Sequence, residues 1–92
     1  MSERKAVIAS SVGLHARPAG IFVAAVGELP IDVTIAMEGE PADDAMDASS
    51  ILSIMSLGAS HGDTVVLRAE GDGADDALDS LVKLLETDLD AE

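Results

Sequence analysis

The first third of the chain changes from a strand pattern to a helix pattern across one short polar turn, and this change constrains the fold more than any other feature. Residues 6–9 form an apolar run fit for a strand, which two serines and Gly13 then interrupt. From Pro18 onward, apolar residues recur at helical spacing: Ala19, Phe22, Val23 and Val26. Proline suits the first turn of a helix, because its missing N–H would have no partner there. The sequence therefore predicts a strand, a glycine-containing turn and a helix over residues 16–27.

Two side chains at the start of this helix suggest chemistry. His15 directly precedes the predicted helix, and Arg17 lies in its first turn. The first N–H groups of a helix lack internal partners and carry the positive end of its dipole, so they favour an anion. A guanidinium offers a planar fork that suits phosphate oxygens. A phosphoryl group on His15 would thus be received by the backbone of Ala16 and Arg17 and by the Arg17 side chain, although the spacing leaves open a histidine that only caps or packs against the helix.

Two segments of the chain resemble the signatures of one protein family. The string Gly-Leu-His-Ala-Arg-Pro-Ala at residues 13–19 resembles the active-site segment of HPr, the histidine-containing phosphocarrier family of the bacterial sugar phosphotransferase system. Residues 47–59 resemble the second signature of that family, a serine leading into a short helix that ends in Met-Ser-Leu-Gly. Both segments stand in the family's order, and the resemblance covers nearly the whole chain.

Length and composition narrow the class of protein. The 92 residues predict one domain over residues 1–92. The absence of cysteine excludes a disulfide framework and a thiolate metal site. The net charge of −13 argues against nucleic-acid binding, which needs a basic face. No apolar run approaches the length of a membrane span, so we expect a cytoplasmic protein without membrane insertion.

Alternating and helical spacing predict the remaining elements. Strands are predicted at residues 4–9, 31–37, 45–48 and 64–69, and helices over residues 51–57 and from residue 74 onward. The order βαββαβα predicts an α+β domain with a four-stranded antiparallel sheet, three helices on one face and water on the other. The HPr family has this open-faced β-sandwich. Residues 38–44 form a polar, acidic turn that looks longer than in the family pattern.

The short helix predicted over residues 51–57 carries apolar side chains that point in more than one direction, so some of them should be exposed. An exposed apolar surface beside the His15 site is a candidate docking surface, whereas the alternative places all of these side chains in the core. The resemblance implies docking through the first two helices, and the candidate residues are Leu14, Ala16, Gly20, Ile51, Leu52 and Met55.

The residues before this helix are candidates for a cap and for regulation. Ser49 and Ser50 both suit the N-cap position. The resemblance implies that Ser50 is the serine phosphorylated by a dedicated kinase in some bacteria, and the alternative is a plain cap. Two other positions stand apart: Val12 replaces a residue that is often polar in relatives, and His61 is expected to be a surface histidine rather than a metal ligand.

The resemblance implies a phosphocarrier rather than a turnover enzyme. Neutral imidazole is a nucleophile, so His15 would accept a phosphoryl group from phosphorylated enzyme I and pass it to sugar-specific enzyme IIA components, without cofactor or metal. An HPr kinase or a transcription regulator is a further expected partner, and we expect a monomer. The alternatives are a paralogous carrier in a nitrogen-regulatory or dihydroxyacetone-kinase branch, a binding module regulated through Ser50, and an acidic interaction domain without phosphorylation.

Overall fold

The computed structural model describes residues 2–14 and 16–87. Along the chain the elements are β1 (Ser2–Val7), α1 (Ala16–Gly27), β2 (Val33–Met37), the 3₁₀ turn η1 (Ala42–Asp44), β3 (Met46–Asp47), α2 (Ile51–Leu57), β4 (Thr64–Ala69) and α3 (Ala74–Leu85). The predicted order of four strands and three helices is confirmed, and η1 is a short addition within the acidic turn.

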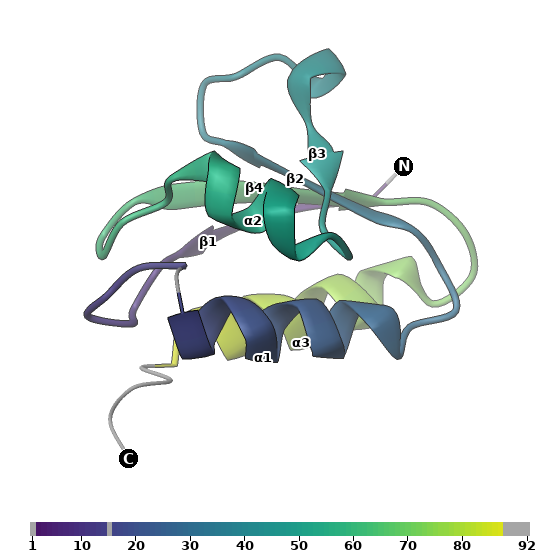
Figure 1. The fold of residues 1–92 in the computed structure, drawn as a ribbon. Coiled ribbons are helices and arrows are strands. Elements are labelled where there is room, and N and C mark those ends of the chain that lie inside the picture. Colours follow the sequence, from purple (N-terminus) through teal and green to yellow (C-terminus); the bar gives the residue numbers. More distant parts are fainter. Residues whose placement is uncertain (1, 15, 88–92) are drawn as a thin grey trace.

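The four strands form one antiparallel sheet in the order β1-β4-β2-β3. Figure 1 shows α1 and α3 side by side beneath the sheet, with α2 beside α1. The predicted open-faced α+β arrangement is therefore confirmed. The inner strands are β4 and β2, so the last strand of the chain is inserted between the first and the second.

The strand boundaries differ slightly from the prediction, and tertiary hydrogen bonds explain the first difference. The first strand spans Ser2–Val7 rather than residues 4–9. Beyond Val7 the backbone leaves the β4 ladder: the N–H of Ile8 donates to Asp63 O (2.9 Å) and that of Ala9 to Leu85 O (3.0 Å). The second strand begins at Val33, and the third is only Met46–Asp47. The predicted helix bounds 16–27 and 51–57 are confirmed.

The core lies between the sheet and the helices. Alternate residues of β4, namely Val65, Leu67 and Ala69, are buried on the helix-covered face. Phe22 of α1 is fully buried among aliphatic side chains. From α3, one stripe faces this core: Ala74, Leu78, Leu81 and Leu85. Burial of these apolar stripes is what holds α1 and α3 on the sheet.

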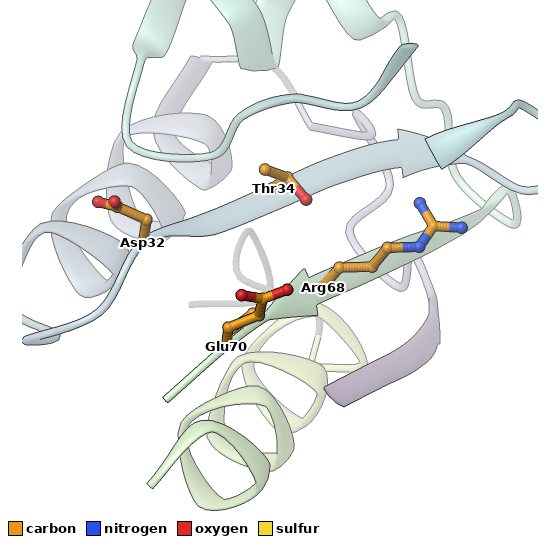
Figure 2. A pocket seen from close by; sticks show the side chains of 5 residues that line it. Asp32, Thr34, Arg68 and Glu70 are labelled. Carbon is orange, nitrogen blue, oxygen red and sulfur yellow. The ribbon is translucent and has the colours of Figure 1, made fainter. Parts of the chain in front are cut away.

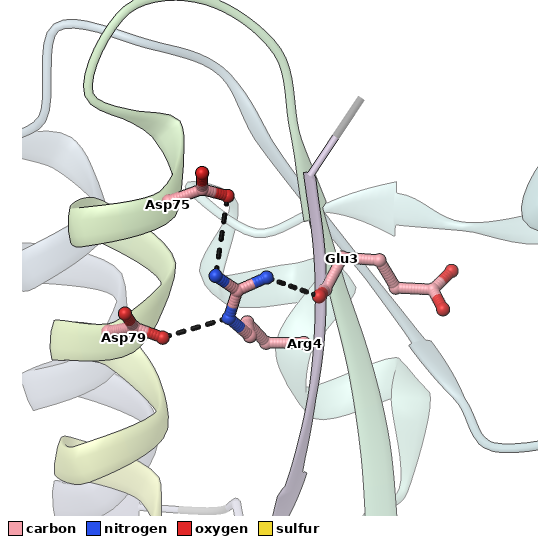
Figure 3. Close-up of polar contacts among 4 residues, drawn as sticks. All are labelled: Glu3, Arg4, Asp75 and Asp79. Carbon is pink, nitrogen blue, oxygen red and sulfur yellow. Dashed lines mark hydrogen bonds and ion pairs between the residues drawn. The ribbon is translucent and has the colours of Figure 1, made fainter.

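A group of charged side chains joins the start of α3 to β1 (Figure 3). The Arg4 Nε donates to Asp79 Oδ1 (2.8 Å), its Nη2 lies 3.3 Å from Asp75 Oδ1, and its Nη1 donates to the backbone oxygen of Glu3 (2.8 Å). The hydrogen bond to Asp79 raises the pKa of Arg4. A hydrogen bond from Ser2, together with Arg4, lowers the pKa of Asp75. These contacts are exposed, so they orient α3 more than they stabilise it.

Candidate functional site

The turn before α1 is fixed by a close approach of two backbone segments. The N–H of Gly13 donates to Ser10 O (2.9 Å), and that of Leu14 donates to Ala59 O (2.9 Å), just beyond α2. Gly13 has a φ of +73°, and a Cβ at this position would collide with Ala59 O and lie 2.8 Å from the Cα of Ser60. Only glycine fits such a position. The turn before α1 is therefore fixed against the segment that follows α2.

The start of α1 has the composition expected of an anion-receiving helix end. Ala16 and Arg17 are its first two residues, and its first turn contains no acidic residue. Arg17 is exposed, whereas Pro18 and Ala19 are buried and anchor the turn in the core. His15 and the side chain of Ala16 lie outside the described residues. The predicted roles of His15, Ala16 and Arg17 in phosphate binding therefore stay predictions, on a helix start that suits them.

The start of α2 settles which serine forms the cap. The Ser50 side chain accepts a hydrogen bond from the N–H of Ser53 (3.4 Å), which makes Ser50 the N-cap. The hydroxyl and the N–H of Ser49 instead donate to Asp47 Oδ1, at 2.6 and 2.9 Å. These bonds, the hydroxyl bond first, lower the pKa of Asp47. Asp47 thus binds the Ser49 hydroxyl, so that Ser49 does not cap α2. Composition and spacing did not predict this contact.

Several docking candidates are exposed. On α2 the side chains of Ile51, Leu52 and Met55 are 39%, 76% and 45% exposed, while Ile54 is fully buried. The expectation that the apolar side chains of this helix divide between core and surface is therefore confirmed. Gly20 is exposed on α1, and α2 lies between α1 and the loop of residues 38–45 (Figure 1).

The assignment of Leu14 to a docking surface is wrong. Its side chain is 1% exposed and belongs to the hydrophobic core. The cause is the hydrogen bond from its N–H to Ala59 O, which draws the chain inward directly after Gly13. Leu14 therefore supports the site from beneath and offers no side-chain surface to a partner. Val12, on the same turn, is 49% exposed.

His61 is an exposed residue, as predicted, and helps to fix the chain before the site. Its Nδ1 lies 3.1 Å from the backbone oxygen of Ala9. Across residues 2–14 and 16–87, no group of three or more histidine, cysteine, aspartate or glutamate side chains could hold a metal ion. Within that same part of the chain, none of the helices combines the length and apolar character needed to cross a membrane.

A hollow of about 290 Å³ lies on the helix-free face of the sheet (Figure 2). It is lined by Asp32, Thr34, Arg68, Ala69 and Glu70. The Arg68 Nε binds Glu3 Oε2 (2.9 Å), and its buried Nη1 has no hydrogen-bond partner among the described residues. Two carboxylates on its wall disfavour a phosphate, and the sheet separates the hollow from α1. The start of α1 is therefore the better candidate for phosphoryl chemistry.

Comparison with known proteins identifies the family. The model of the "PTS HPr component phosphorylation site" family matches residues 2–87. The chain belongs to the HPr family. The phosphocarrier protein HPr of Streptomyces coelicolor is 41% identical over 91 residues, covering 98% of this chain and 94% of that protein. The HPr of Haloferax volcanii is 41% identical over 85 residues, covering 92% and 93%.

Solved HPr structures agree with this assignment. The crystal structure of HPr from Bacillus anthracis matches with a TM-score of 0.81 and 30% identity, covering 91% of this chain and 95% of that one. An HPr structure from Thermoanaerobacter tengcongensis matches with a TM-score of 0.80 and 40% identity, covering 94% and 92%. The chain is thus an HPr-type phosphocarrier of the phosphotransferase system, which interacts with components of that system and is not a turnover enzyme.

Proposed function

We propose that this HPr-family chain accepts a phosphoryl group on His15 from phosphorylated enzyme I and passes it to sugar-specific enzyme IIA components in the cytoplasm. The observation that supports this most strongly is the start of α1. The turn before α1 contains Gly13, at a position where only glycine fits; the first helical turn has no carboxylate, and Arg17 is its one charged side chain. The family match supplies the reaction class.

The proposed step is an in-line transfer between two nucleophiles. A neutral imidazole nitrogen of His15 forms a bond to phosphorus as the bond between phosphorus and the donor breaks, and the electron pair of that bond stays with the donor. The N–H groups of Ala16 and Arg17 and the Arg17 guanidinium would stabilise the negative charge on the phosphoryl oxygens. Such transfer depends mainly on positioning and electrostatics, so the rest of the chain need supply only a rigid support.

The test is incubation with enzyme I and phosphoenolpyruvate, followed by measurement of the intact mass. We expect one acid-labile phosphoryl group on the wild type and on His61→Ala, and none on His15→Ala. The His61 variant is the matched control, because it removes the other histidine of the chain. A phosphoryl group that persists in His15→Ala would contradict the proposal, as would a wild type that takes up none.

The same assay can distinguish the pathway branches. A carrier of sugar transport passes its labelled phosphoryl group to a sugar-specific enzyme IIA, whereas a paralogous carrier prefers components of a nitrogen-regulatory or dihydroxyacetone-kinase branch. We expect faster transfer to the sugar-specific acceptors. Preference for the other acceptors would leave the chemistry at His15 in place and reassign the branch.

Ser50 is proposed as a regulatory phosphorylation site. It caps α2 directly beside the exposed Ile51 and Leu52, so a phosphate there would add negative charge at the edge of the docking surface. We expect Ser50→Asp to slow phosphoryl transfer from enzyme I more than Ser49→Asp does. Ser49 is the matched control, because its hydroxyl binds Asp47 instead of capping α2. Equal rates for the two variants would remove the regulatory role, without affecting the proposal for His15.

A further inference from the structure

The connection between α2 and β4 supports the turn before α1 at both of its ends. At the start of this turn, the N–H of Ile8 donates a hydrogen bond to Asp63 O (2.9 Å). At its end, the N–H of Leu14 donates to Ala59 O (2.9 Å). Leu14 is the last residue before His15. The position of the connection therefore helps to decide where the chain enters α1.

The side chain of Asp63 shapes this connection. The Asp63 Oδ2 accepts a hydrogen bond from the N–H of Ser60 (2.9 Å), and the N–H of Asp63 donates to Ser60 O (3.0 Å). These bonds close a four-residue β-turn, whose third residue, Gly62, has a φ of +88°. The carboxylate thus adds a second link between the first and fourth residues of the turn, beside the link that the backbone makes.

Ser60 is also a residue against which the turn before α1 packs. A Cβ at Gly13 would lie only 2.8 Å from the Cα of Ser60, so the two backbones are in close contact. Ser60 directly follows Ala59, whose oxygen accepts the N–H of Leu14. A shift of Ser60 would disturb both supports. Phosphoryl transfer depends on positioning, and a displacement of about 1 Å can lower a rate about a hundredfold.

Part of the turn before α1 is held without the Asp63 side chain. The N–H of Ala9 donates to Leu85 O (3.0 Å) at the end of α3, and the backbone bond between Gly62 N–H and Ile8 O (2.8 Å) needs no side chain. Loss of the carboxylate should therefore loosen the turn rather than release it, and should slow transfer rather than abolish it.

We propose that Asp63 is a positioning residue for phosphoryl transfer. Its carboxylate fixes Ser60, and the backbone around Ser60 holds the residues that lead to His15. The role depends on one accepted hydrogen bond and not on the negative charge of the side chain. The inference rests on the proposed function, which places the transfer at His15.

Three variants test this role. Asp63→Ala removes the acceptor, whereas Asp63→Asn removes the charge and keeps a side-chain oxygen of the same reach. Asp79→Ala is the matched control in α3, because it also removes one carboxylate and one hydrogen bond, the bond from Arg4 Nε (2.8 Å). Single-turnover phosphorylation at a range of phosphorylated enzyme I concentrations measures the limiting rate and the half-saturating concentration separately. Amide hydrogen exchange measures the opening of the Leu14 bond.

We expect the limiting rate of Asp63→Ala to fall about threefold to tenfold, because the nucleophile is less well positioned. The half-saturating concentration should stay within about twofold of the wild type, because no docking contact is lost. The Leu14 amide should exchange faster in this variant, while the amides of α3 keep their protection. Asp63→Asn and Asp79→Ala should both keep the limiting rate within about twofold of the wild type.

An unchanged limiting rate in Asp63→Ala would overturn the inference. It would also be overturned by equal slowing in Asp63→Asn, which would indicate a role for charge, or in Asp79→Ala, which would indicate general destabilisation. A change confined to the half-saturating concentration would assign Asp63 to docking instead. In each case a normally phosphorylated wild type leaves the proposed function intact, whereas a wild type that accepts no phosphoryl group overturns both.

Discussion

The two long helices have the same length but carry side chains of opposite charge in their first turns. α1 and α3 each span 12 residues, but α3 has Asp75 and Asp76 in its first turn, whereas α1 has no acidic residue there and carries Arg17. Carboxylates at a helix start stabilise the helix through its dipole. The positive end of α3 is therefore satisfied by the chain itself, and that of α1 favours an anion from outside. The first turn of α3 therefore stabilises its own helix, whereas the first turn of α1 is suited to bind a phosphoryl group.

The turns that lead into the two helices differ in the same way. Gly13 before α1 and Gly73 before α3 both have positive φ, at +73° and +81°. A Cβ at Gly73 would meet no heavy atom within 4 Å, whereas one at Gly13 would strike the backbone of Ala59. The α1 turn is thus locked to the segment that follows α2, and the α3 turn is not.

The largest expected effect comes from substituting these glycines. Gly13→Ala should lower the free energy of unfolding by more than about 3 kcal/mol, because backbone atoms must move to admit the methyl group. Gly73→Ala should cost only about 1–2 kcal/mol, the price of a left-handed conformation alone. Chemical denaturation of both variants measures the difference. Equal losses would mean that the α1 turn is no more constrained than the α3 turn.

The next effect concerns the arginines near the two helix starts. Arg17→Ala should slow phosphoryl transfer by about tenfold to a hundredfold, because a cation is lost where negative charge gathers. Arg4→Ala breaks the contacts to Asp75 and Asp79 at α3, so it should reduce stability slightly and leave transfer unchanged. Single-turnover kinetics and thermal melts distinguish these outcomes. An Arg17→Ala variant that unfolds would show a structural role instead.

The smallest expected effect is a pH dependence at α3. The pKa of Asp75 is lowered in the folded state, first by the hydrogen bond from Ser2 and then by Arg4. Its contribution to stability is therefore fully present above the ordinary aspartate pKa of about 3.9 and is lost as the pH falls through the folded value. The stability difference between wild type and Asp75→Asn should be constant from about pH 5 to 7 and shrink in more acidic solution. A difference that grows with acid would contradict this assignment.

Periodic sequence patterns predicted the helices of this chain. Contacts between distant segments determine the two features that the patterns did not predict, namely the bounds of the first strand and the burial of Leu14. Helical spacing and Gly58, which ends α2 at φ +70°, gave the correct bounds of α1 and α2. The first strand was shifted because Ile8 pairs with Asp63, and Leu14 was misplaced because its N–H binds Ala59. Both depend on tertiary hydrogen bonds between residues more than 40 positions apart, which no local pattern encodes.

In the candidate site, too, local patterns predicted some features, while others depend on tertiary contacts. The motif at residues 13–19 predicts phosphoryl chemistry at His15, which stays a prediction. The sequence also predicted that the α2 side chains would divide between core and surface, and this is confirmed. It did not distinguish Ser49 from Ser50, because that choice depends on a hydrogen bond to Asp47. The position of residues 38–45 beside α2 likewise follows from the pairing of β2 with β3 in the sheet.

The most direct test is an NMR comparison of the backbone amides before and after phosphorylation by enzyme I and phosphoenolpyruvate. If the start of α1 receives the phosphoryl group, the amide signals of Ala16 and Arg17 should move strongly, while those of residues 74–77 at the start of α3 should stay in place. Unmoved signals for Ala16 and Arg17 in a fully phosphorylated sample would contradict a phosphoryl group bound at the start of α1.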